Sequence, residues 1–291
     1  MRGTLLEQEP LAEYSTWRVG GPARYFYQPA DAEDLSEYLK SLPDDLPLFW
    51  LGLGSNCLIR DGGFPGVVIH TQGSLAQLER LDESTVKAQA GVSCAALARF
   101  CARQQLAGAE FWAGIPGTVG GALKMNAGCF NGETWDSVKS VMTIDRQGKI
   151  RERGRDEFEV HYREVRSEHP EWFLAGTFEL KPGDKELSLN TIRELLDRRA
   201  RTQPTGDYTC GSVFRNPPGD HAGRLIESCG LKGFRIGGAA VSEKHANFIV
   251  NDQNAKASDI EQLIEHVRET VTQRTGISLH PEVHIIGEKH E

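Results

Sequence analysis

The sequence predicts an α+β fold that is divided into two domains. The chain has 291 residues, about twice the ~150 residues expected of one domain. Short strand patterns alternate with helical patterns along it, and the composition changes after Pro182-Gly183-Asp184, so the boundary is expected between Pro182 and Thr202. We place a first domain over residues 1–184 and a smaller one over residues 185–291.

The elements expected in the first domain follow from hydrophobic spacing and from residues that begin or end helices. Residues 31–42 predict a helix that ends at Pro43, and Ser93 begins a second helix that ends at Gly108. The charged span 146–159 predicts a solvated hairpin or loop. Short apolar runs predict strands over residues 47–53, 66–70, 138–144 and 171–180.

The second domain is expected to combine three helices with two short strands. Residues 187–201 predict a helix with a basic end, which Pro204 closes, and residues 220–229 predict a shorter one. Residues 258–275 predict a long helix that stops at Gly276. The strands are predicted at residues 247–250 and within 282–287.

Charge and composition exclude several classes of function. Asp plus Glu outnumber Lys plus Arg by 41 to 33, which argues against nucleic-acid binding and against anionic membrane surfaces. No run approaches the ~18 apolar residues of a transmembrane helix, and residues 1–10 lack the apolar segment of a secretory signal. The six cysteines form no CxxC pair, which favours reduced thiols in a cytoplasmic protein over a zinc site or a disulfide framework.

A glycine turn follows the first strand predicted after residue 43. Its residues Gly52, Gly54, Ser55 and Asn56 offer amide groups and polar side chains that suit a pyrophosphate. A Rossmann dinucleotide fingerprint would need a third glycine where this chain has Cys57, so that fold is excluded here. From the residues alone, a phosphate-binding turn and a plain turn between two strands both remain open.

A second glycine-rich segment is denser and moderately apolar. Its glycines argue against a regular element and favour backbone lying close against a flat or extended ligand. Thr118 suits the N-cap of a short helix directed at an anion, and a cluster of structural turns is the alternative. Two such segments in one chain favour a cofactor with two ends, such as a dinucleotide. The residues of the second segment are Gly114, Ile115, Pro116, Gly117, Thr118, Gly120 and Gly121, followed by Asn126, Ala127 and Gly128.

Motifs along nearly the whole chain resemble those of one enzyme family. The first motifs are Thr16-Trp17-Arg18-Val19-Gly20-Gly21-Pro22-Ala23, Leu53-Gly54-Ser55-Asn56 and Gly114-Ile115-Pro116-Gly117-Thr118-Val119-Gly120-Gly121. Later ones are Tyr162-Arg163, Gly211-Ser212-Val213-Phe214-Arg215-Asn216-Pro217, Gly230-Leu231-Lys232-Gly233, Val241-Ser242-Glu243-Lys244-His245-Ala246-Asn247-Phe248 and Pro281-Glu282-Val283. In this order they resemble the bacterial UDP-N-acetylenolpyruvoylglucosamine reductase family, the UDP-N-acetylmuramate dehydrogenases of peptidoglycan synthesis.

The resemblance implies a fold and a reaction. The first domain would be a two-lobed FAD-binding domain of the vanillyl-alcohol-oxidase type, and the second would bind substrate, with its last strand, 282–287, returning towards the flavin. NADPH would reduce FAD, and the reduced flavin would deliver hydride from N5 to the vinyl C3 of UDP-N-acetyl-3-O-enolpyruvylglucosamine. Protonation at C2 would give UDP-N-acetylmuramate. Both glycine segments would then bind FAD.

Three residues match the catalytic positions of that family. Ser212 would donate the proton to C2. A serine hydroxyl is a weak acid, but a strongly basic carbon can accept its proton. From the residues alone, Ser212 reads as a serine in a turn. Arg163 would hold the substrate carboxylate, although most arginines in so charged a stretch are solvated. It is followed by Glu164-Val165, where the family often has serine. Glu282 would face a developing dianion, so we expect its pKa to be raised; otherwise it is a strand-end carboxylate in water.

Further residues are weaker candidates for the nucleotide sugar. His245 and Asn247 are either ligand contacts or structural residues, and Tyr208 is a candidate cover for the diphosphate. His280 and His284 flank Glu282, but no metal site is expected. The residues assigned to the uridine diphosphate and its sugar are Asn216, Arg215, Gln203 and Lys232.

The resemblance points to the shorter subclass of the family. The stretch between Arg163 and Ser212 leaves no room for the tyrosine-bearing loop that some members close over the substrate. Two alternatives are another FAD oxidoreductase of the same fold and a non-catalytic protein that binds nucleotide sugars. The first would lack the C-terminal matches, and the second would lack Ser212, Arg163 or Glu282. We expect a monomer with no obligate protein partner.

Overall fold

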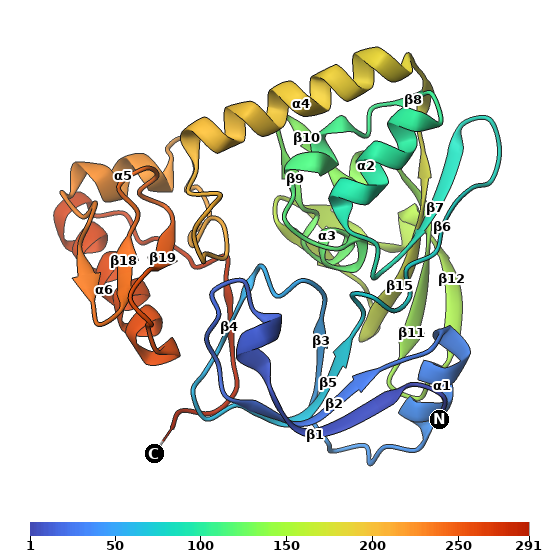
Figure 1. The fold of residues 1–291 in the computed structure, drawn as a ribbon, viewed down its shortest axis with the longest axis horizontal. Helices are drawn as coiled ribbons and strands as arrows, with labels where there is room; N and C mark the ends of the chain where they lie inside the picture. Colours follow the sequence, from blue (N-terminus) through green and yellow to red (C-terminus); the bar gives the residue numbers. More distant parts are fainter. Residues whose placement is uncertain (291) are drawn as a thin grey trace. The chain divides into compact units, whose positions relative to one another are not determined.

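The structure, a computed structural model, describes residues 1–290 and contains both helices and strands, which confirms the α+β class. The chain forms two compact units, each built from more than one stretch of sequence (Figure 1). Unit 1 comprises Met1–Leu6, Phe26–Leu53 and Val67–Arg198. Unit 2 comprises Glu7–Tyr25, Gly54–Gly66 and the residues from Arg199 onward. Along the chain, unit 1 ends at Arg198, which lies inside the interval 182–202 where the domain boundary is expected. Unit 2 also includes Glu7–Tyr25 and Gly54–Gly66, which a single boundary at residue 184 assigns to the first domain.

Two larger sheets organise unit 1. The strand order of the first sheet is β1 (Thr4–Pro10), β2 (Pro22–Gln28), β5 (Phe64–His70) and β3 (Leu48–Leu51), with β3 parallel to β5. Strands β1, β2 and β5 each include residues on both sides of a boundary between the units. The second sheet is antiparallel, in the order β12 (Ile150–Gly154), β11 (Val138–Asp145), β15 (Glu171–Glu179), β7 (Thr85–Gln89) and β6 (Leu78–Arg80). Three pairs of short antiparallel strands complete it: β9 (Gly128–Cys129) with β10 (Gly132–Glu133), β13 (Glu159–His161) with β14 (Glu164–Arg166), and β8 (Leu106–Ala107) with β16 (Lys181–Pro182).

The helices of unit 1 begin where the sequence provides a cap. The Asp31 carboxylate accepts from the Asp34 N–H at 2.9 Å, and the Ser93 hydroxyl accepts from the Ala96 N–H at 3.2 Å, so two orphan donors are satisfied. The α-helices are α1 (Ala32–Lys40), α2 (Cys94–Arg103), α3 (Val119–Met125) and α4 (Lys185–Thr202), which extends beyond the unit boundary. The 3-10 helices are η2 (Glu110–Gly114), η3 (Thr134–Asp136) and η4 (Arg155–Glu157).

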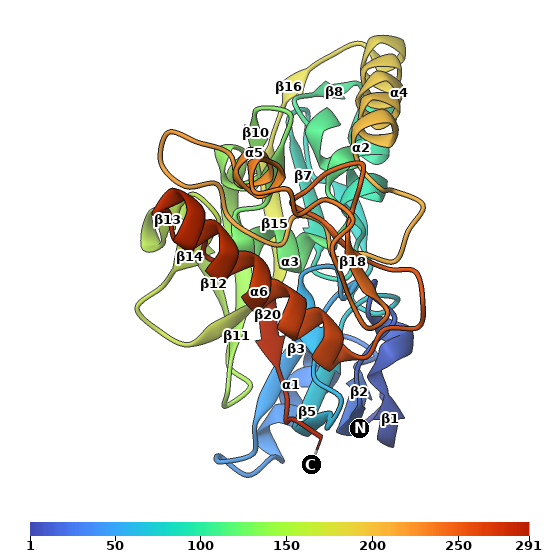
Figure 2. The ribbon, with the colours of Figure 1, turned by 90° about the vertical axis from the view of Figure 1, so that its left-hand side faces the viewer.

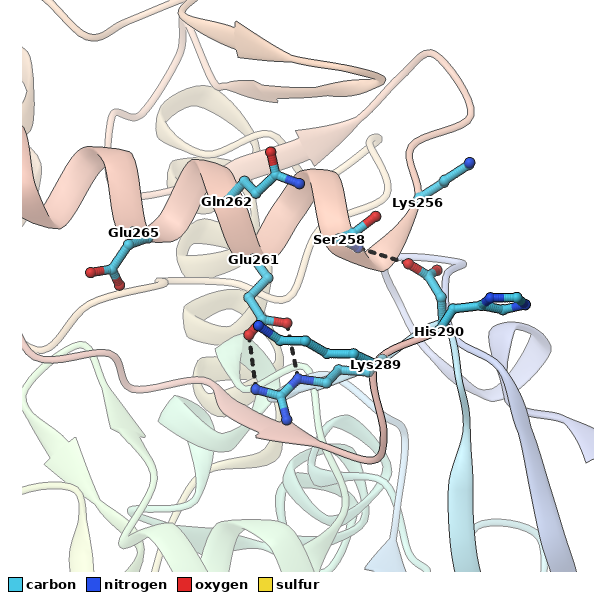
Figure 3. Close-up of a pocket in the computed structure, with 9 residues that line it drawn as sticks. Lys256, Ser258, Glu261, Gln262, Glu265, Lys289 and His290 are labelled. Atoms are coloured by element: carbon cyan, nitrogen blue, oxygen red, sulfur yellow. Dashed lines mark hydrogen bonds and ion pairs between the residues drawn. The ribbon is translucent and has the colours of Figure 1, made fainter.

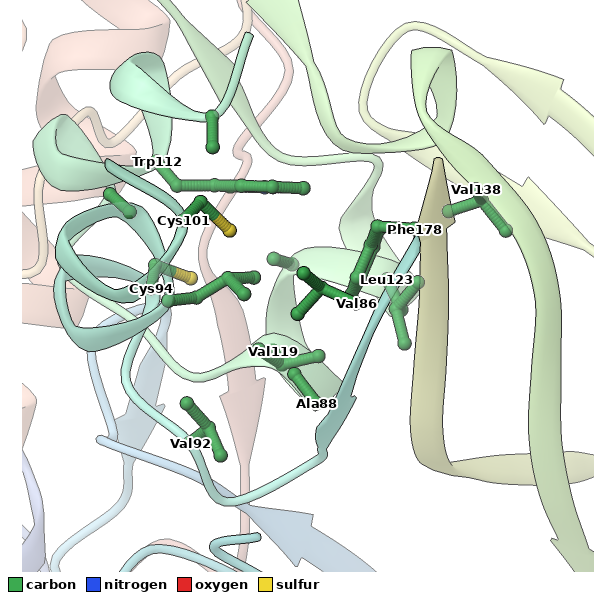
Figure 4. Close-up of a cluster of buried hydrophobic side chains, with 14 of the residues drawn as sticks. Val86, Ala88, Val92, Cys94, Cys101, Trp112, Val119, Leu123, Val138 and Phe178 are labelled. Carbon is green, nitrogen blue, oxygen red and sulfur yellow. The ribbon is translucent and has the colours of Figure 1, made fainter. Parts of the chain in front are cut away.

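The core of unit 1 lies between helices α2 and α3 and the antiparallel sheet. Figure 4 shows Cys94 and Cys101 of α2 facing Val86 and Phe178 of the strands. The Trp112 ring meets Phe178 edge-on, with ring centroids 4.8 Å apart, an arrangement that aromatic quadrupoles favour. This packing fixes the segment that leads from Trp112 into the second glycine-rich stretch.

Unit 2 combines several short elements with one long helix. Helix α6 (Ala257–Thr275) buries Ile260, Leu263, Ile264, Val267 and Val271 along one face, as helical spacing requires, and ends at Gly276 in the left-handed conformation (φ 73°). Figure 2 shows α6 running ahead of the final strand. The other elements are η1 (Leu11–Tyr14), β4 (Cys57–Ile59), α5 (Ala222–Ser228), β17 (Arg235–Ile236), β18 (Ala239–Val241), β19 (Ile249–Asn251) and β20 (His284–Ile286).

Strand pairing in unit 2 joins segments from both ends of the sequence. Strands β17, β18 and β19 form an antiparallel sheet. Strand β20 pairs in parallel with β4, placing His284 opposite Cys57 and Ile286 opposite Ile59. The predicted terminal strand is therefore confirmed, and it returns to the segment that follows the first glycine turn.

Two features of the described residues concern membranes and metal ions. Among residues 1–290, no helix combines the length and the apolar character needed to cross a membrane. The same residues hold no group of three or more His, Cys, Asp and Glu side chains arranged to bind a metal ion.

Candidate active site

The two glycine-rich segments meet inside unit 1. A Cβ added to Gly52 would lie 2.3 Å from Thr118 Oγ1, so the backbone after strand β3 runs directly against the start of α3. The Val119 and Gly120 amides donate to the Val92 and Ala90 carbonyls at 2.8 and 2.9 Å, which anchors the second segment to the sheet. The glycines are therefore required for a close approach of backbone that larger residues would prevent.

The prediction that glycines prevent a regular element in the second segment is wrong. Residues Val119–Met125 form helix α3, with Thr118 at the N-cap position but without a side-chain capping bond. The helix buries Val119, Ala122 and Leu123, so tertiary packing outweighs the low helix propensity of the two glycines. Asn126 ends the helix in the left-handed conformation.

The first glycine turn presents unused hydrogen-bond donors. None of the backbone N–H groups of residues 52–56 donates to another residue within the described chain. In unit 2, Gly54 has a φ of 66°, and a Cβ there would lie 2.0 Å from the Tyr14 carbonyl oxygen. Next to it, the Ser15 hydroxyl is buried and has no hydrogen-bond partner in residues 1–290. Successive unpaired amides and a buried hydroxyl suit an oxygen-rich anion, so these residues fit the pyrophosphate of a dinucleotide.

A buried histidine supports the first turn from within unit 1. The Gln28 amide lies 2.8 Å from His70 Nδ1, and the ring also bonds the Gly52 backbone. Burial lowers the pKa of His70 to about 4, so the ring is neutral at physiological pH. The sequence analysis missed His70, because a lone histidine at a strand end carries no distinctive signal.

Arg163 is oriented by the second glycine segment. Its guanidinium donates to the Gly128 carbonyl at 2.7 Å and to the Asn126 carbonyl at 3.3 Å, and it lies 5.0 Å from the centre of the Tyr162 ring. The residue has a φ of 58°, in the left-handed region that non-glycine residues rarely occupy. Strain of this kind is typical of functional positions, where the surroundings hold the side chain in one direction.

Asn126 links the segments around Arg163. Its side-chain amide donates to Glu133 Oε2 at 2.8 Å and to the His161 carbonyl at 3.2 Å, and its oxygen accepts from the Trp135 N–H at 3.1 Å. The side chain is almost fully buried, and these three bonds use its donors and an acceptor within the protein. Its contacts therefore organise the loop.

Ser212 and Glu282 are brought together in unit 2. Phe214 pairs with Pro281 across an antiparallel bridge, and the Glu282 N–H donates to the Val213 carbonyl at 2.8 Å. The Ser212 hydroxyl is half-buried and makes no hydrogen bond to the residues that the structure describes. It is therefore free to act on a ligand.

Asn56 joins the first glycine turn to the segment that contains Glu282. Its side-chain amide donates to the Glu282 carbonyl at 3.3 Å, and its own carbonyl accepts from the His284 N–H at 3.1 Å. The sequence placed Asn56 at the cofactor, whereas its side chain here fixes the backbone of Glu282. Residues 226 positions apart share this bond, so no local pattern could have revealed it.

The residues predicted to hold the nucleotide sugar mostly bond within the protein. Asn216 Oδ1 accepts from the Ala222 N–H at 3.0 Å, at the start of α5, and Gln203 Oε1 accepts from Arg199 Nε at 2.9 Å. Lys232 forms an ion pair with Glu227 at 2.8 Å. The Arg215 N–H donates to the His280 carbonyl at 2.9 Å.

Tyr208 lies near Arg18 within unit 2. Its side chain is 54% exposed, and the Arg18 guanidinium lies 5.9 Å from the centre of its ring. An exposed aromatic ring beside a cation is available to a ligand that passes over it.

One surface pocket of unit 2 contains none of the predicted site residues. Its volume is about 920 Å³, and Figure 3 shows Glu261, Gln262 and Glu265 of α6 on one side and Lys289 and His290 on another. The Arg60 guanidinium is bound to both oxygens of Glu261, and the Asp61 carboxylate caps the first turn of α6. These interactions stabilise the fold locally.

Comparisons with known proteins agree with the motifs. The C-terminal domain model of UDP-N-acetylenolpyruvoylglucosamine reductase matches residues 203–286, and an FAD binding domain model matches residues 23–154. The UDP-N-acetylenolpyruvoylglucosamine reductase of Legionella pneumophila strain Lens is 62% identical, over 99% of this chain and 94% of its own. That of Coxiella burnetii strain Dugway is 52% identical, over 99% and 97%.

A solved structure extends the similarity to three dimensions. The crystal structure of UDP-N-acetylenolpyruvylglucosamine reductase from Thermus caldophilus matches with a TM-score of 0.81 at 33% identity. The match covers 98% of this chain and 99% of that one. The similarity therefore extends over nearly the whole chain, beyond the motifs themselves.

Proposed function

The chain belongs to the UDP-N-acetylenolpyruvoylglucosamine reductase family, and from that premise we propose which of its residues carry out the reaction. It is an NADPH-dependent flavoprotein oxidoreductase that reduces UDP-N-acetyl-3-O-enolpyruvylglucosamine to UDP-N-acetylmuramate for peptidoglycan synthesis. Two electrons and a proton reach C3 together as hydride, and a second proton reaches C2, which converts the enolpyruvyl ether into a lactyl ether.

FAD is held by the glycine segments in this proposal. The unpaired backbone N–H groups of residues 52–56 and the buried Ser15 hydroxyl would hold its pyrophosphate, and the backbone that begins at Gly114 would bind a further part of the cofactor. When bound, FAD supplies the hydride that NADPH provides. We assign this role to residues 1–184 and the binding of substrate to residues 185–291.

Arg163 binds the carboxylate of the enolpyruvyl group. The charge that develops at C2 spreads into this carboxylate, so a fixed cation stabilises the transition state more than the ground state. The carbonyls of Asn126 and Gly128 support this assignment, because they hold the guanidinium in one orientation.

Ser212 donates the proton to C2, and Glu282 stabilises the charge at the same centre. The observation that carries this assignment is the pairing of the segment after Ser212 with Pro281–Glu282. In addition, the Ser212 hydroxyl makes no hydrogen bond to any described residue. The proton comes from the Ser212 oxygen, which water then reprotonates. Asn216, Arg215, Gln203 and Lys232 are assigned to the uridine diphosphate and sugar, with Tyr208 over the diphosphate.

The setting of the reaction follows from the same residues. All three proposed catalytic groups come from this chain, so we propose that a monomer is sufficient. The six cysteines are free thiols, which supports a reducing compartment such as the cytoplasm. The product would serve wall synthesis during cell growth and division.

The visible absorption spectrum of the purified protein tests the proposal. Flavin bands should bleach when NADPH is added without oxygen, and the enolpyruvyl nucleotide should restore them. A colourless protein that FAD cannot reconstitute would contradict the redox function. Bleached flavin that this substrate leaves unchanged would mean that the substrate assignment is wrong.

The Ser212→Ala variant tests the proton donor. Flavin reduction by NADPH should stay within about twofold of wild type, because the hydroxyl takes no part in it. Reoxidation by substrate should slow by ~10²-fold or more, as expected on removing a general acid. Equal losses in both half-reactions would mean that Ser212 has a structural role.

A further inference from the structure

Asn247 binds the backbone immediately after Ser212 with three hydrogen bonds. Its side-chain oxygen accepts from the Phe214 N–H at 3.0 Å, and its side-chain amide donates to the Phe214 carbonyl at 2.8 Å. Its main-chain carbonyl accepts from the Val213 N–H at 2.9 Å. The side chain thus bonds Phe214 as a neighbouring strand would.

Asn247 is itself fixed. Only 4% of it is exposed, and its N–H donates to His245 Nδ1 at 3.2 Å. The His245 ring contacts the start of α5, where a Cβ on Gly223 would lie 3.1 Å from its Cε1. The sequence left His245 and Asn247 open between ligand contacts and structural residues; Asn247 is buried and bonded to backbone, and His245 is partly buried and bonded to Asn247.

On its other edge, the segment Ser212–Phe214 is held by Pro281 and Glu282. Hydrogen bonds on the two edges tie the backbone of Val213 and Phe214 to both neighbouring segments. On the N-terminal side, Gly211 has a φ of 73°, and a Cβ there would meet nothing within 4 Å. Ser212 is therefore held from its C-terminal side, while its N-terminal neighbour is unconstrained by packing.

We propose that Asn247 is a positioning residue that fixes the direction of the Ser212 hydroxyl and so sets the rate of protonation at C2. The inference rests on the proposed role of Ser212. Without the Asn247 side chain, Phe214 would keep its pairing with Pro281, and the serine would gain freedom about Gly211. A misplacement of about 1 Å at a reacting group costs ~10²-fold in rate.

The test compares Asn247→Ala with Asn251→Ala. Asn251 is equally a buried asparagine whose side chain bonds only backbone, donating to the Trp17 carbonyl at 2.9 Å and accepting from the Ala255 N–H at 2.8 Å. Both variants should lose similar stability, because each loses two such bonds. Only Asn247→Ala should slow flavin reoxidation by substrate, by about 10- to 100-fold, with NADPH reduction unchanged in both.

Hydrogen exchange gives a second readout that does not depend on turnover. In Asn247→Ala, the amides of residues 213–216 should exchange faster than in wild type, and in Asn251→Ala they should not. Asn247→Asp keeps the acceptor for the Phe214 N–H and loses the donor, so its reoxidation rate should lie between wild type and Asn247→Ala. If Asn247→Ala does not fold, Asn247→Asp carries the test alone.

The outcomes separate this inference from the proposed function. If Ser212→Ala reoxidises at the wild-type rate, the proton-donor assignment fails whatever Asn247 does. If Ser212→Ala is slow and Asn247→Ala matches Asn251→Ala in both half-reactions, the positioning role of Asn247 alone is overturned. Slow reoxidation in Asn247→Ala with unchanged exchange at residues 213–216 would also overturn it.

Discussion

The guanidinium of Arg163 donates a 2.7 Å hydrogen bond to the backbone carbonyl of Gly128. A glycine that the sequence assigned to the cofactor thus orients the arginine that the sequence assigned to the substrate. The acceptor is a neutral carbonyl, so this bond orients the guanidinium through its N–H group.

Arg163→Lys should reduce the rate of flavin reoxidation by substrate by roughly 10- to 100-fold. An ammonium cannot bond two carbonyls and also form a forked pair with a carboxylate, and charged hydrogen bonds contribute ~1.5–3 kcal/mol. Stopped-flow absorbance measures both half-reactions. Arg166→Lys is the control, because Arg166 is exposed, paired with Glu164 and only three residues away. Equal effects in the two variants would refute a specific role for Arg163.

Asn126→Gly should raise the KM for the enolpyruvyl nucleotide while FAD stays bound. Glycine keeps the left-handed backbone (φ 41°) and removes the side chain that bonds the His161 carbonyl, two residues before Arg163. The control is Asn131→Gly, an exposed left-handed position with φ 67°. Loss of flavin absorbance from Asn126→Gly alone would show instead that Asn126 serves the cofactor.

Gly54→Ala should lose FAD as well as stability. The new Cβ would lie 2.0 Å from the Tyr14 carbonyl, so the turn has to move and its amides lose their alignment. Gly73→Ala is matched in backbone, with φ 81°, and meets nothing within 4 Å, so it should cost only the ~1–2 kcal/mol of left-handed strain. Thermal unfolding and the flavin-to-protein absorbance ratio measure the two effects. Full flavin content in Gly54→Ala would contradict the assignment of this turn.

His70 should make unfolding depend on pH below neutrality. Burial lowers its pKa to about 4 from an ordinary value of 6.5, so the unfolded chain binds the proton more readily. The stabilisation is complete above pH 6.5 and is lost as the pH falls towards 4. Between pH 8 and pH 5, wild type should lose about 2 kcal/mol more than His70→Gln in urea unfolding. Parallel curves for the two proteins would show that the histidine titrates normally.

Local signals predicted the longer helices of the fold. Asp31 and Ser93 cap helices α1 and α2, and Gly276 ends α6, because each needs only a few neighbouring residues to act. Several strands of two or three residues, such as β9, β17 and β18, were missed because so short a segment has no measurable alternation, although the equally short β19 and β20 were predicted from their apolar residues. Strand β1 was missed for another reason: nearly all of its side chains are exposed, so no buried face marks it.

For the candidate site too, some features were predicted from the sequence and others were not. The resemblance to the family proposed Ser212, Arg163 and Glu282, because from the residues alone Ser212 reads as a turn serine and Arg163 as one solvated arginine among many. The bonds that hold them were not predictable, since Asn247 contacts Phe214 across 33 residues and Asn56 contacts Glu282 across 226. Such side-chain bonds to distant backbone depend on the finished fold.

The parallel pairing of β20 with β4 has a consequence for biosynthesis. Strand β4 ends at Ile59, whereas its partner begins at His284, so a nascent chain presents β4 to solvent until residues 284–286 have been synthesised. At ~5–20 residues per second, that interval lasts ten seconds or more, during which the strand edge is open to wrong partners. Chaperones that shield such edges on the ribosome should therefore affect the yield of this enzyme more than its stability once complete.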